Sequence, residues 1–325
     1  MIRKDNITIT LYEHWMHHQV VRMICRQYER TENNQDELMQ NFYEHPYQRE
    51  RSIRIVALDG KKVVGFQSFF YWPYLLDGRL KNGYQSGNSI IGPEYRGMGI
   101  FQRLLNYLDT IRKYKQIDFL TGFPVKSSYG SFIRNKWTNI LNLSWYIKAS
   151  SPFSLFRRYD PVKLSLDKSP KLVIEIPASK GFVLNRNHDF EAWRENYSRH
   201  IHYFYFHFAD GVNCVRFNMK VNLRLRGILK ELIIGRVQTN CESLDFLEVA
   251  VKALVRKIYK EHMFAFISVA LNAQYFKGKI LQAFMKAGFK IINKQIYFCV
   301  KDFTIKKKLF QPDLWELYRS AIDTW

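Results

Sequence analysis

The most informative segment of the chain reads Asn88-Ser-Ile-Ile-Gly-Pro-Glu-Tyr-Arg-Gly-Met-Gly-Ile-Phe101. It predicts a strand over residues 86–91, a turn with two glycines, and a helix that begins at the turn. The first amides of a helix have no partner within it, and small residues let such amides approach a pyrophosphate. The turn is therefore a candidate anion site, with Arg96 as an added positive charge. The glycine spacing alone is also compatible with an ordinary strand–turn–helix connection.

The residues on either side of this segment predict a mixed α/β module. Before it, residues 51–72 form two β-rich runs around Asp59-Gly60, a dipeptide suited to a type I′ hairpin turn. After it, residues 97–115 predict a helix, because one apolar stripe recurs at the helical period. The stripe consists of Ile100, Phe101, Leu104, Leu105, Leu108 and Ile111. A short strand (118–124), a short helix (127–137) and a last strand (139–148) complete the predicted module.

The second half of the chain repeats this order of elements. It predicts a strand (226–237), an amphipathic helix (243–262) with Ser243 as N-cap, a buried strand (264–271), a helix (279–289) and a strand (290–301). Trp137 and Phe289 close equivalent helices. We therefore predict an α/β (α+β) protein with two tandem modules, residues 1–150 and 173–325. Residues 151–172 are rich in Ser and contain Pro152, Pro161 and Pro170, which predicts a linker.

Two blocks of the first half resemble a known superfamily. The first contains Pro93, Glu94, Tyr95, Arg96, Gly97, Gly99, Ile100, Phe101, Leu104 and Leu105; the second contains Gly122, Phe123, Pro124, Ser128, Phe132 and Trp137. The first block is similar to the acyl-CoA loop R-x-x-G-x-G/A of the GCN5-related N-acetyltransferase superfamily, in a branch that reads R-G-x-G-I-F. The likeness extends more weakly through the second half to the carboxy-terminal Asp-Thr-Trp.

The resemblance implies a fold, a cosubstrate and a reaction. Each module would be a mixed, mostly antiparallel central sheet flanked by helices. Acetyl-CoA would bind with its pyrophosphate on the amides of residues 96–102 and its pantetheine arm along the strand 86–91. The implied coenzyme-binding residues are Ile90, Ile91, Arg96, Gly97, Met98, Gly99, Ile100, Phe101, Gln102 and Ser128. The amine of a small polar acceptor, such as an amino sugar or a nucleotide sugar, would attack the thioester directly.

The chain departs from the family pattern at the positions that carry proton transfer. Val125 stands where the family commonly has Asn, and Phe132 stands where it commonly has the Tyr that protonates the departing thiolate. Tyr129, one helical turn earlier, is the candidate acid, with core packing as its alternative role. Glu94 is the candidate base, with a structural ion pair beside Arg96 as the alternative. The second half has no Gly-rich turn before its helix, so we expect it to have lost coenzyme binding and either to shape the acceptor cleft or to pack against the first module.

Composition limits the class of protein. The chain has 325 residues, 47% of them hydrophobic, and 50 Lys and Arg against 29 Asp and Glu, for a net charge of +21. Global disorder is excluded by this apolar content. Four scattered cysteines without a CxxC pair argue against a disulfide framework or a zinc ribbon and favour a reducing compartment. No signal peptide or membrane-spanning segment is readable, so we expect a soluble, cytoplasmic protein.

The histidines form two further clusters. His14, His17 and His18 have a spacing that suits a metal face, but no ligand completes the site, so we predict surface histidines and no metal. His200, His202 and His207 lie in one predicted strand, whose alternation places His200 and His202 on one sheet face. These two suit packing or an exposed edge, or an acceptor cleft in which either would be the base.

The charge leaves two other functions open. Residues 1–150 hold 21 basic and 13 acidic residues, and residues 151–325 hold 29 and 16. This basic balance would suit an aminoacyl-tRNA-dependent peptidoglycan-type transferase, although the RGMGIF loop argues against one and nucleic acid is not the expected partner. A row of Lys220, Arg224 and Arg226 near Phe217 is more simply a solvated sheet face than a nucleic-acid track. A third possible function, suggested by the departures from the family pattern, is that of a non-catalytic binding protein of the same fold.

Overall fold

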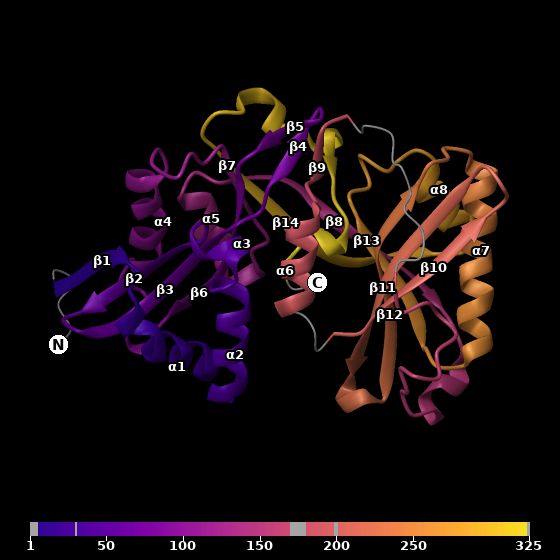
Figure 1. Cartoon of the computed structure of the whole chain (residues 1–325), viewed down its shortest axis with the longest axis horizontal. Coiled ribbons are helices and arrows are strands. Elements are labelled where there is room, and N and C mark those ends of the chain that lie inside the picture. Colours follow the sequence, from indigo (N-terminus) through magenta and orange to yellow (C-terminus); the bar gives the residue numbers. More distant parts are fainter. Residues whose placement is uncertain (1–5, 30, 170–179, 198–200, 324–325) are drawn as a thin grey trace.

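A computed structural model of the chain describes residues 6–29, 31–169, 180–197 and 201–323 (Figure 1). Within them, eleven strands form one sheet, in the order β1-β2-β3-β6-β7-β14-β8-β13-β12-β11-β10. The bounds in this order are Ile7–Leu11, Ile53–Asp59, Lys62–Tyr71, Gly83–Ile91, Phe119–Gly122, Lys290–Asp302, Thr138–Ala149, Phe266–Leu271, Leu229–Thr239, Cys214–Arg224 and Tyr203–Ala209. Only the β6–β7 and β12–β13 pairs of this sheet are parallel. The predicted two-module α/β fold with a mostly antiparallel sheet is confirmed.

Helices and a small second sheet cover the large sheet. The helices are α1 (His17–Tyr28), α2 (Glu32–Tyr43), α3 (Pro46–Arg49), α4 (Ile100–Ile111), α5 (Lys126–Arg134), α6 (His188–Tyr197), α7 (Leu244–Glu261) and α8 (Lys279–Lys286). The small sheet runs β15 (Trp315–Glu316), β9 (Phe182–Leu184), β4 (Tyr74–Leu76) and β5 (Arg79–Lys81). Helices α4 and α5 pack on the first half of the large sheet, and α7 and α8 pack on the second half, each through its apolar stripe.

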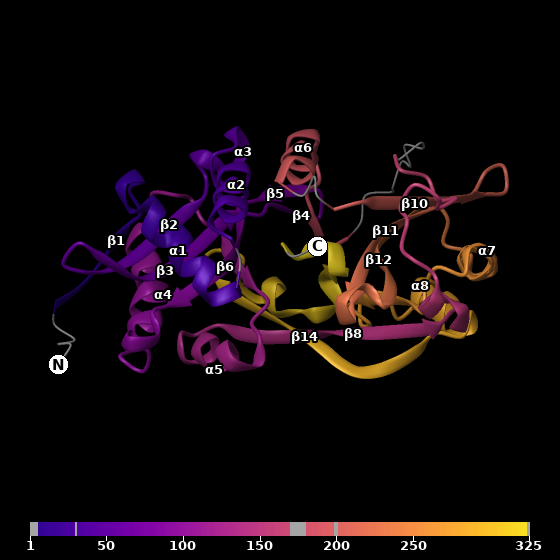
Figure 2. The ribbon, with the colours of Figure 1, turned by 90° about the horizontal axis from the view of Figure 1, so that it is seen from below.

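The two halves of the chain exchange their long last strands. Strand β14, from the second half, pairs with β7 of the first half, and β8, from the first half, pairs with β13 of the second. β8 and β14 also pair with each other along most of their lengths. Figure 2 shows both strands crossing from one half to the other. Each half therefore depends on the other for the pairing of a strand that would otherwise be a sheet edge.

Two local predictions need correction. In the β2–β3 hairpin the central turn residues are Gly60 and Lys61, and of these only Gly60 has a positive φ (57°), so the turn is not type I′. Helix α4 begins at Ile100 rather than at residue 97, because Gly97 and Gly99 both adopt the left-handed conformation. The predicted N-cap of α7 is confirmed, since the Ser243 side chain accepts a hydrogen bond from the amide of Phe246.

The exchanged strand β14 carries part of the shared core, which gives a stability prediction. Phe298 is fully buried, with its ring 5.0 Å from that of Phe123 and 4.9 Å from that of Trp315. We expect Phe298→Ala to lower the free energy of unfolding by about 3–5 kcal/mol, measured by urea denaturation of the full chain. The control Ile291→Ala, at a 63% exposed position of the same strand, should change it by less than about 0.5 kcal/mol. Equal losses for the two variants would contradict the packing described.

Candidate functional site

The parallel strands β6 and β7 separate in the middle of the first half. Their pairing runs from Gly83 opposite Phe119 to Ser86 opposite Gly122, where β7 ends. β6 continues to Ile91, paired only with β3 on its other side. Residues 87–91 therefore form a strand edge with no sheet partner on the β7 side, and we call the place where the two strands part the opening. An extended group can pair with such an edge as an added strand.

A β-bulge lies at the point where this opening begins. Between the pairs Ser68–Gly87 and Phe66–Ile90, strand β6 has one residue more than β3, and Asn88 is left-handed with φ 49°. Side chains fix the bulge, because Ser68 Oγ donates to the Gly87 carbonyl at 2.8 Å and Asn88 Nδ2 donates to the Tyr43 hydroxyl at 2.7 Å. The bulge removes backbone groups of residues 88 and 89 from regular pairing. Such groups are available to polarise a carbonyl placed in the opening.

The glycine loop follows β6 directly and opens α4. Gly97 and Gly99 have φ of 79° and 76°, and a Cβ on either would meet open space. No hydrogen-bond partner for the amides of residues 97–102 lies within the described part of the chain, whereas the Arg96 amide donates to the Pro93 carbonyl at 3.3 Å. The Arg96 amide is therefore already bonded, and the amides of the other six residues stay the predicted cradle. Backbone amides at a helix start form an anion site.

The side chain of Arg96 lies beside this loop. Its Nη2 donates to Gln27 Oε1 of α1 at 2.8 Å and its Nε to the Ile91 carbonyl at 3.2 Å. These bonds hold the guanidinium, which stays exposed, against the end of β6. The positive charge predicted next to the turn is present in the structure and is fixed in place.

Several predicted coenzyme residues could contribute only main-chain groups. Ile90 and Ile100 are buried, and Met98, Phe101 and Ile91 pack on the core that α4 covers. The Ile90 side chain lies in a different cluster, under α1, as expected for alternate faces of a strand. Gln102 is half-buried, and Ser128 Oγ donates to the Val125 carbonyl at 3.1 Å in the first turn of α5.

The two catalytic candidates lie in different surroundings. The centroid of the Tyr129 ring lies 4.6 Å from that of the Tyr297 ring of β14. Neither hydroxyl makes a hydrogen bond to any described residue. Phe132, at the family's Tyr position, is buried between Phe101 and Trp137 and cannot transfer a proton. Tyr129 thus has a packing role and an available hydroxyl.

Glu94 forms an ion pair, although with Lys62 rather than with Arg96. The Lys62 Nζ lies 2.9 Å from Glu94 Oε1. A hydrogen bond from its own backbone amide and the one from Lys62 lower the pKa of Glu94. A carboxylate with a lowered pKa is a weaker base. The geometry therefore favours the structural alternative for Glu94.

A carboxylate from the far end of the chain reaches β6 instead. Asp323 Oδ1 accepts a hydrogen bond from Gln85 Nε2 at 2.7 Å, and its Oδ2 would lie 3.6 Å from a Cβ on Gly87. The Tyr197 hydroxyl of α6 donates to the Asp323 carbonyl at 3.0 Å. The end of the described chain lies between the two halves in Figures 1 and 2. Only the carboxy-terminal Asp-Thr-Trp of the resemblance pointed to this residue, since 238 residues separate it from Gln85.

The second half places cations near this carboxylate. Strand β11 packs Val215, Phe217 and Met219 under α7 and α8, so Arg216 and Lys220 alternate onto the opposite face. Burial, with the charges of Arg319 and Arg194, lowers the pKa of Lys220 to about 7. The charge of Asp323 acts on both of those arginines. Of the predicted solvated face, Lys220 is therefore partly enclosed, whereas Arg226 is exposed and Arg224 forms an ion pair with Glu231.

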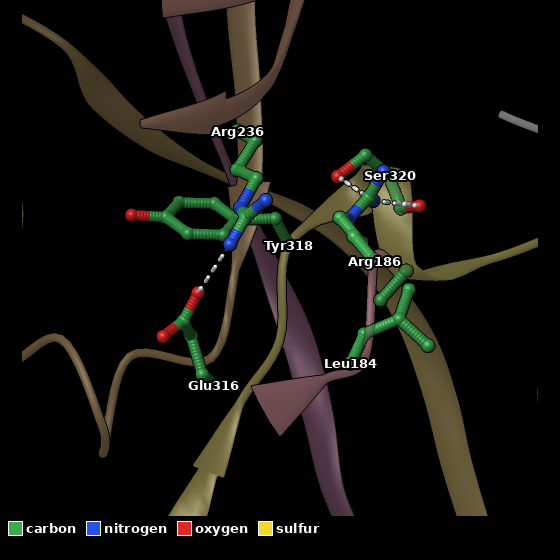
Figure 3. A pocket seen from close by; sticks show the side chains of 7 residues that line it. Leu184, Arg186, Arg236, Glu316, Tyr318 and Ser320 are labelled. Carbon is green, nitrogen blue, oxygen red and sulfur yellow. Dashed lines mark hydrogen bonds and ion pairs between the residues drawn. The ribbon is translucent and has the colours of Figure 1, made fainter. Parts of the chain in front are cut away.

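A small polar recess lies next to this cluster (Figure 3). Arg186 Nη2 donates to the Ser320 carbonyl at 2.7 Å, and Arg236 lies 3.7 Å from Glu316. Burial lowers the pKa of Arg186 to about 10. These contacts hold the segment before Asp323 against β12 and α6.

The histidine predictions fare unequally. His14 and His18 are exposed, but His17 is buried and bonds Asp36 and the Tyr12 hydroxyl, so it is not a surface residue. Helix α2 covers it, which the spacing of the histidines could not reveal. His200 lies outside the described residues, while His202 is exposed and His207 half-buried. No group of three or more His, Cys, Asp or Glu among the described residues could hold a metal ion.

Comparison with known proteins places the fold. No protein-family model and no curated protein matches the chain. A GCN5-related N-acetyltransferase from Anabaena variabilis ATCC 29413 matches 91% of this chain and 72% of its own, with a TM-score of 0.61 and 13% identity. A tandem GNAT protein from the clavulanic acid biosynthesis pathway matches 91% of this chain and 98% of its own, with a TM-score of 0.51 and 12% identity.

A third solved structure comes from an acyltransferase with its cosubstrate. Saccharomyces cerevisiae N-myristoyltransferase with bound myristoyl-CoA matches 99% of this chain and 84% of its own, with a TM-score of 0.53 and 9% identity. At such identities the likeness concerns the fold. The chain has the fold of the GCN5-related N-acetyltransferase superfamily, in its two-module form.

Proposed function

We propose that the protein is an acyl-CoA-dependent N-acyltransferase that moves an acetyl group from acetyl-CoA to the amine of a small polar acceptor. One observation carries the proposal: the free edge of β6 leads into a loop whose amides, at residues 97–102, have no hydrogen-bond partner among the described residues. A helix start of this kind suits a pyrophosphate. The strand edge before it suits the amide-bearing arm of the same coenzyme.

The residues around the opening divide the work of the reaction. Amides of residues 97–102, with Arg96, would hold the diphosphate, and backbone groups at the Asn88 bulge would stabilise the oxyanion. Bound acetyl-CoA supplies an activated thioester, which an amine can attack without an enzyme-bound intermediate. Asp323 would accept the proton of the acceptor ammonium, since its carboxylate lies beside Gly87 on the same strand. Tyr129 remains the candidate for protonating the thiolate.

The charge on the second half favours an acceptor with an anionic group. Lys220, Arg319 and Arg194 are close enough for their charges to act on one another, and a phosphate or carboxylate beside them would relieve that repulsion. A nucleotide-linked amino sugar combines such a group with an amine. All four cysteines are free, which fits the reducing cytoplasm as the place of the reaction. None of the described helices is long and apolar enough to cross a membrane.

Two measurements on the purified protein test the function. Calorimetry should give micromolar binding of coenzyme A, and acetyl transfer should be found in a panel that pairs neutral amino sugars with nucleotide-linked ones. We expect the nucleotide-linked members to have the lower KM. Coenzyme binding without turnover across the panel would favour a binding protein. Salt-sensitive tRNA binding without coenzyme binding would replace the proposal with the aminoacyl-tRNA reading.

A further inference from the structure

Two short segments of the chain expose large apolar side chains at one end of the second half. Just after β8, residues Pro152–Phe156 form a 3-10 turn in which Phe153 is 62%, Leu155 49% and Phe156 89% exposed. At the end of the β11–β12 hairpin, Leu225 is 71% and Ile228 57% exposed. We call these five residues the apolar tip. Single exposed apolar residues are ordinary, but a contiguous group marks an interaction surface.

A buried lysine ties the two segments of the tip together. The Lys230 Nζ donates to the Arg157 carbonyl, at the end of the 3-10 turn, at 2.7 Å. It also donates to the Ile228 carbonyl, in the hairpin, at 3.0 Å. In Figure 1 both segments lie along the lower edge of the second half. One side chain therefore joins the two segments that carry the exposed apolar residues.

The outward direction of these side chains is built into the local structure. In the 3-10 turn, Ser151 and Ser154 are the buried residues, and Ser151 Oγ lies 2.9 Å from His262 Nδ1. The two serines thus face the protein, whereas Leu155 and Phe156 are exposed and Phe153 is exposed apart from its ring contact with His262. In the hairpin, Leu225 is held in the left-handed conformation with φ 48°, which is uncommon for a residue other than glycine. A segment that only faces water usually exposes its polar residues and buries its apolar ones; here the apolar residues are exposed and the serines are buried.

Three arginines are neighbours in sequence of the apolar residues of the tip. The exposed side chains of Arg157, Arg158 and Arg226 form no ion pair within the described part of the chain. The nearby Asp160 is matched by Lys163 at 3.6 Å. The second half holds 29 basic and 16 acidic residues, a surplus that one coenzyme site in the first half does not use. Exposed apolar side chains with arginines next to them are typical of proteins that rest on anionic phospholipid.

We propose that the apolar tip docks the protein on the surface of a membrane that contains anionic phospholipid, with its apolar side chains inserted at the level of the headgroups. A second copy of the chain fits the tip less well, because pairing two tips would bring their arginines together in a protein of net charge +21. An anionic headgroup layer matches both the charge and the apolar area.

Vesicle co-sedimentation of the full chain tests the docking. Binding to vesicles of equal parts phosphatidylglycerol and phosphatidylcholine should exceed binding to phosphatidylcholine alone by about tenfold or more, and should weaken as salt rises. Phe156→Ser and Leu225→Ser should each lower the partition coefficient by about tenfold. Arg158→Gln should reduce the preference for phosphatidylglycerol. The matched control Tyr114→Ser, at an 88% exposed position in the first half, should bind like the unchanged chain.

Three results would overturn the proposal. The first is equal binding to both kinds of vesicle, and the second is binding that Phe156→Ser, Leu225→Ser and Arg158→Gln all leave unchanged. The third is a concentration-dependent dimer in light scattering that Phe156→Ser dissolves while vesicles bind nothing, which would assign the tip to self-association. Melting temperatures of the variants show whether each is folded. The assay does not read acetyl transfer, so it stands or falls independently of the proposed reaction.

Discussion

Gly99→Glu should abolish coenzyme A binding. Gly99 sits at the start of α4 in the left-handed conformation, with open space where a Cβ would be. A glutamate there puts a carboxylate among the amides proposed to receive the pyrophosphate and forces a strained φ on the loop. We expect the dissociation constant in calorimetry to rise on the order of a hundredfold or more, beyond the measurable range for a micromolar ligand.

The chain contains a close control for this substitution. Gly78, in the β4–β5 turn, has φ 78° against 76° for Gly99, and its Cβ position is also open. Gly78→Glu therefore introduces the same charge and a similar backbone strain away from the loop, and it should leave coenzyme binding unchanged. If both variants bind coenzyme A as tightly as the unchanged chain, the loop is not the pyrophosphate site. If both lose binding, the effect is one of strain or charge in general.

Features that depend on residues close together in the sequence could be predicted from it. The turn with Gly97 and Gly99, the apolar stripe of α4 and the N-cap Ser243 each depend on residues within one or two helical turns. The repeated order of elements gave the two-module fold for the same reason. Errors arose where the conformation of single residues matters, as in the β2–β3 turn, whose positive φ falls on Gly60 alone.

Features that depend on distant pairing could not be predicted. Strands β8 and β14 read as ordinary last strands of their halves, and nothing in their alternation states which strand each will pair with. The burial of His17 follows from α2 packing over α1, and the closeness of Asp323 to Gln85 follows from the path of the whole second half. Both are products of tertiary structure. The groups proposed for proton transfer could therefore not be identified from local sequence.

Asp323→Asn should slow acetyl transfer while leaving coenzyme affinity intact. An asparagine keeps an oxygen that can accept the hydrogen bond from Gln85 Nε2, so the segment should stay in place, but it has no carboxylate to take the ammonium proton. We expect kcat to fall by about a hundredfold, within the range measured for loss of a general base. The assay uses the best acceptor of the amine panel, with calorimetry of coenzyme A alongside.

The pH profile separates a catalytic role of Asp323 from a structural one. A carboxylate base works only when deprotonated, so the rate of the unchanged protein should fall at acidic pH. Asp323→Asn should lose that acidic limb while retaining any limb due to the amine itself. Asp313→Asn removes an exposed carboxylate from the same terminal segment and should keep both rate and profile. A purely structural Asp323 would instead lower the melting temperature and the coenzyme affinity and leave the acidic limb unchanged. That outcome would return the role of base to another residue, with the half-buried His207 of β10 as the next to substitute.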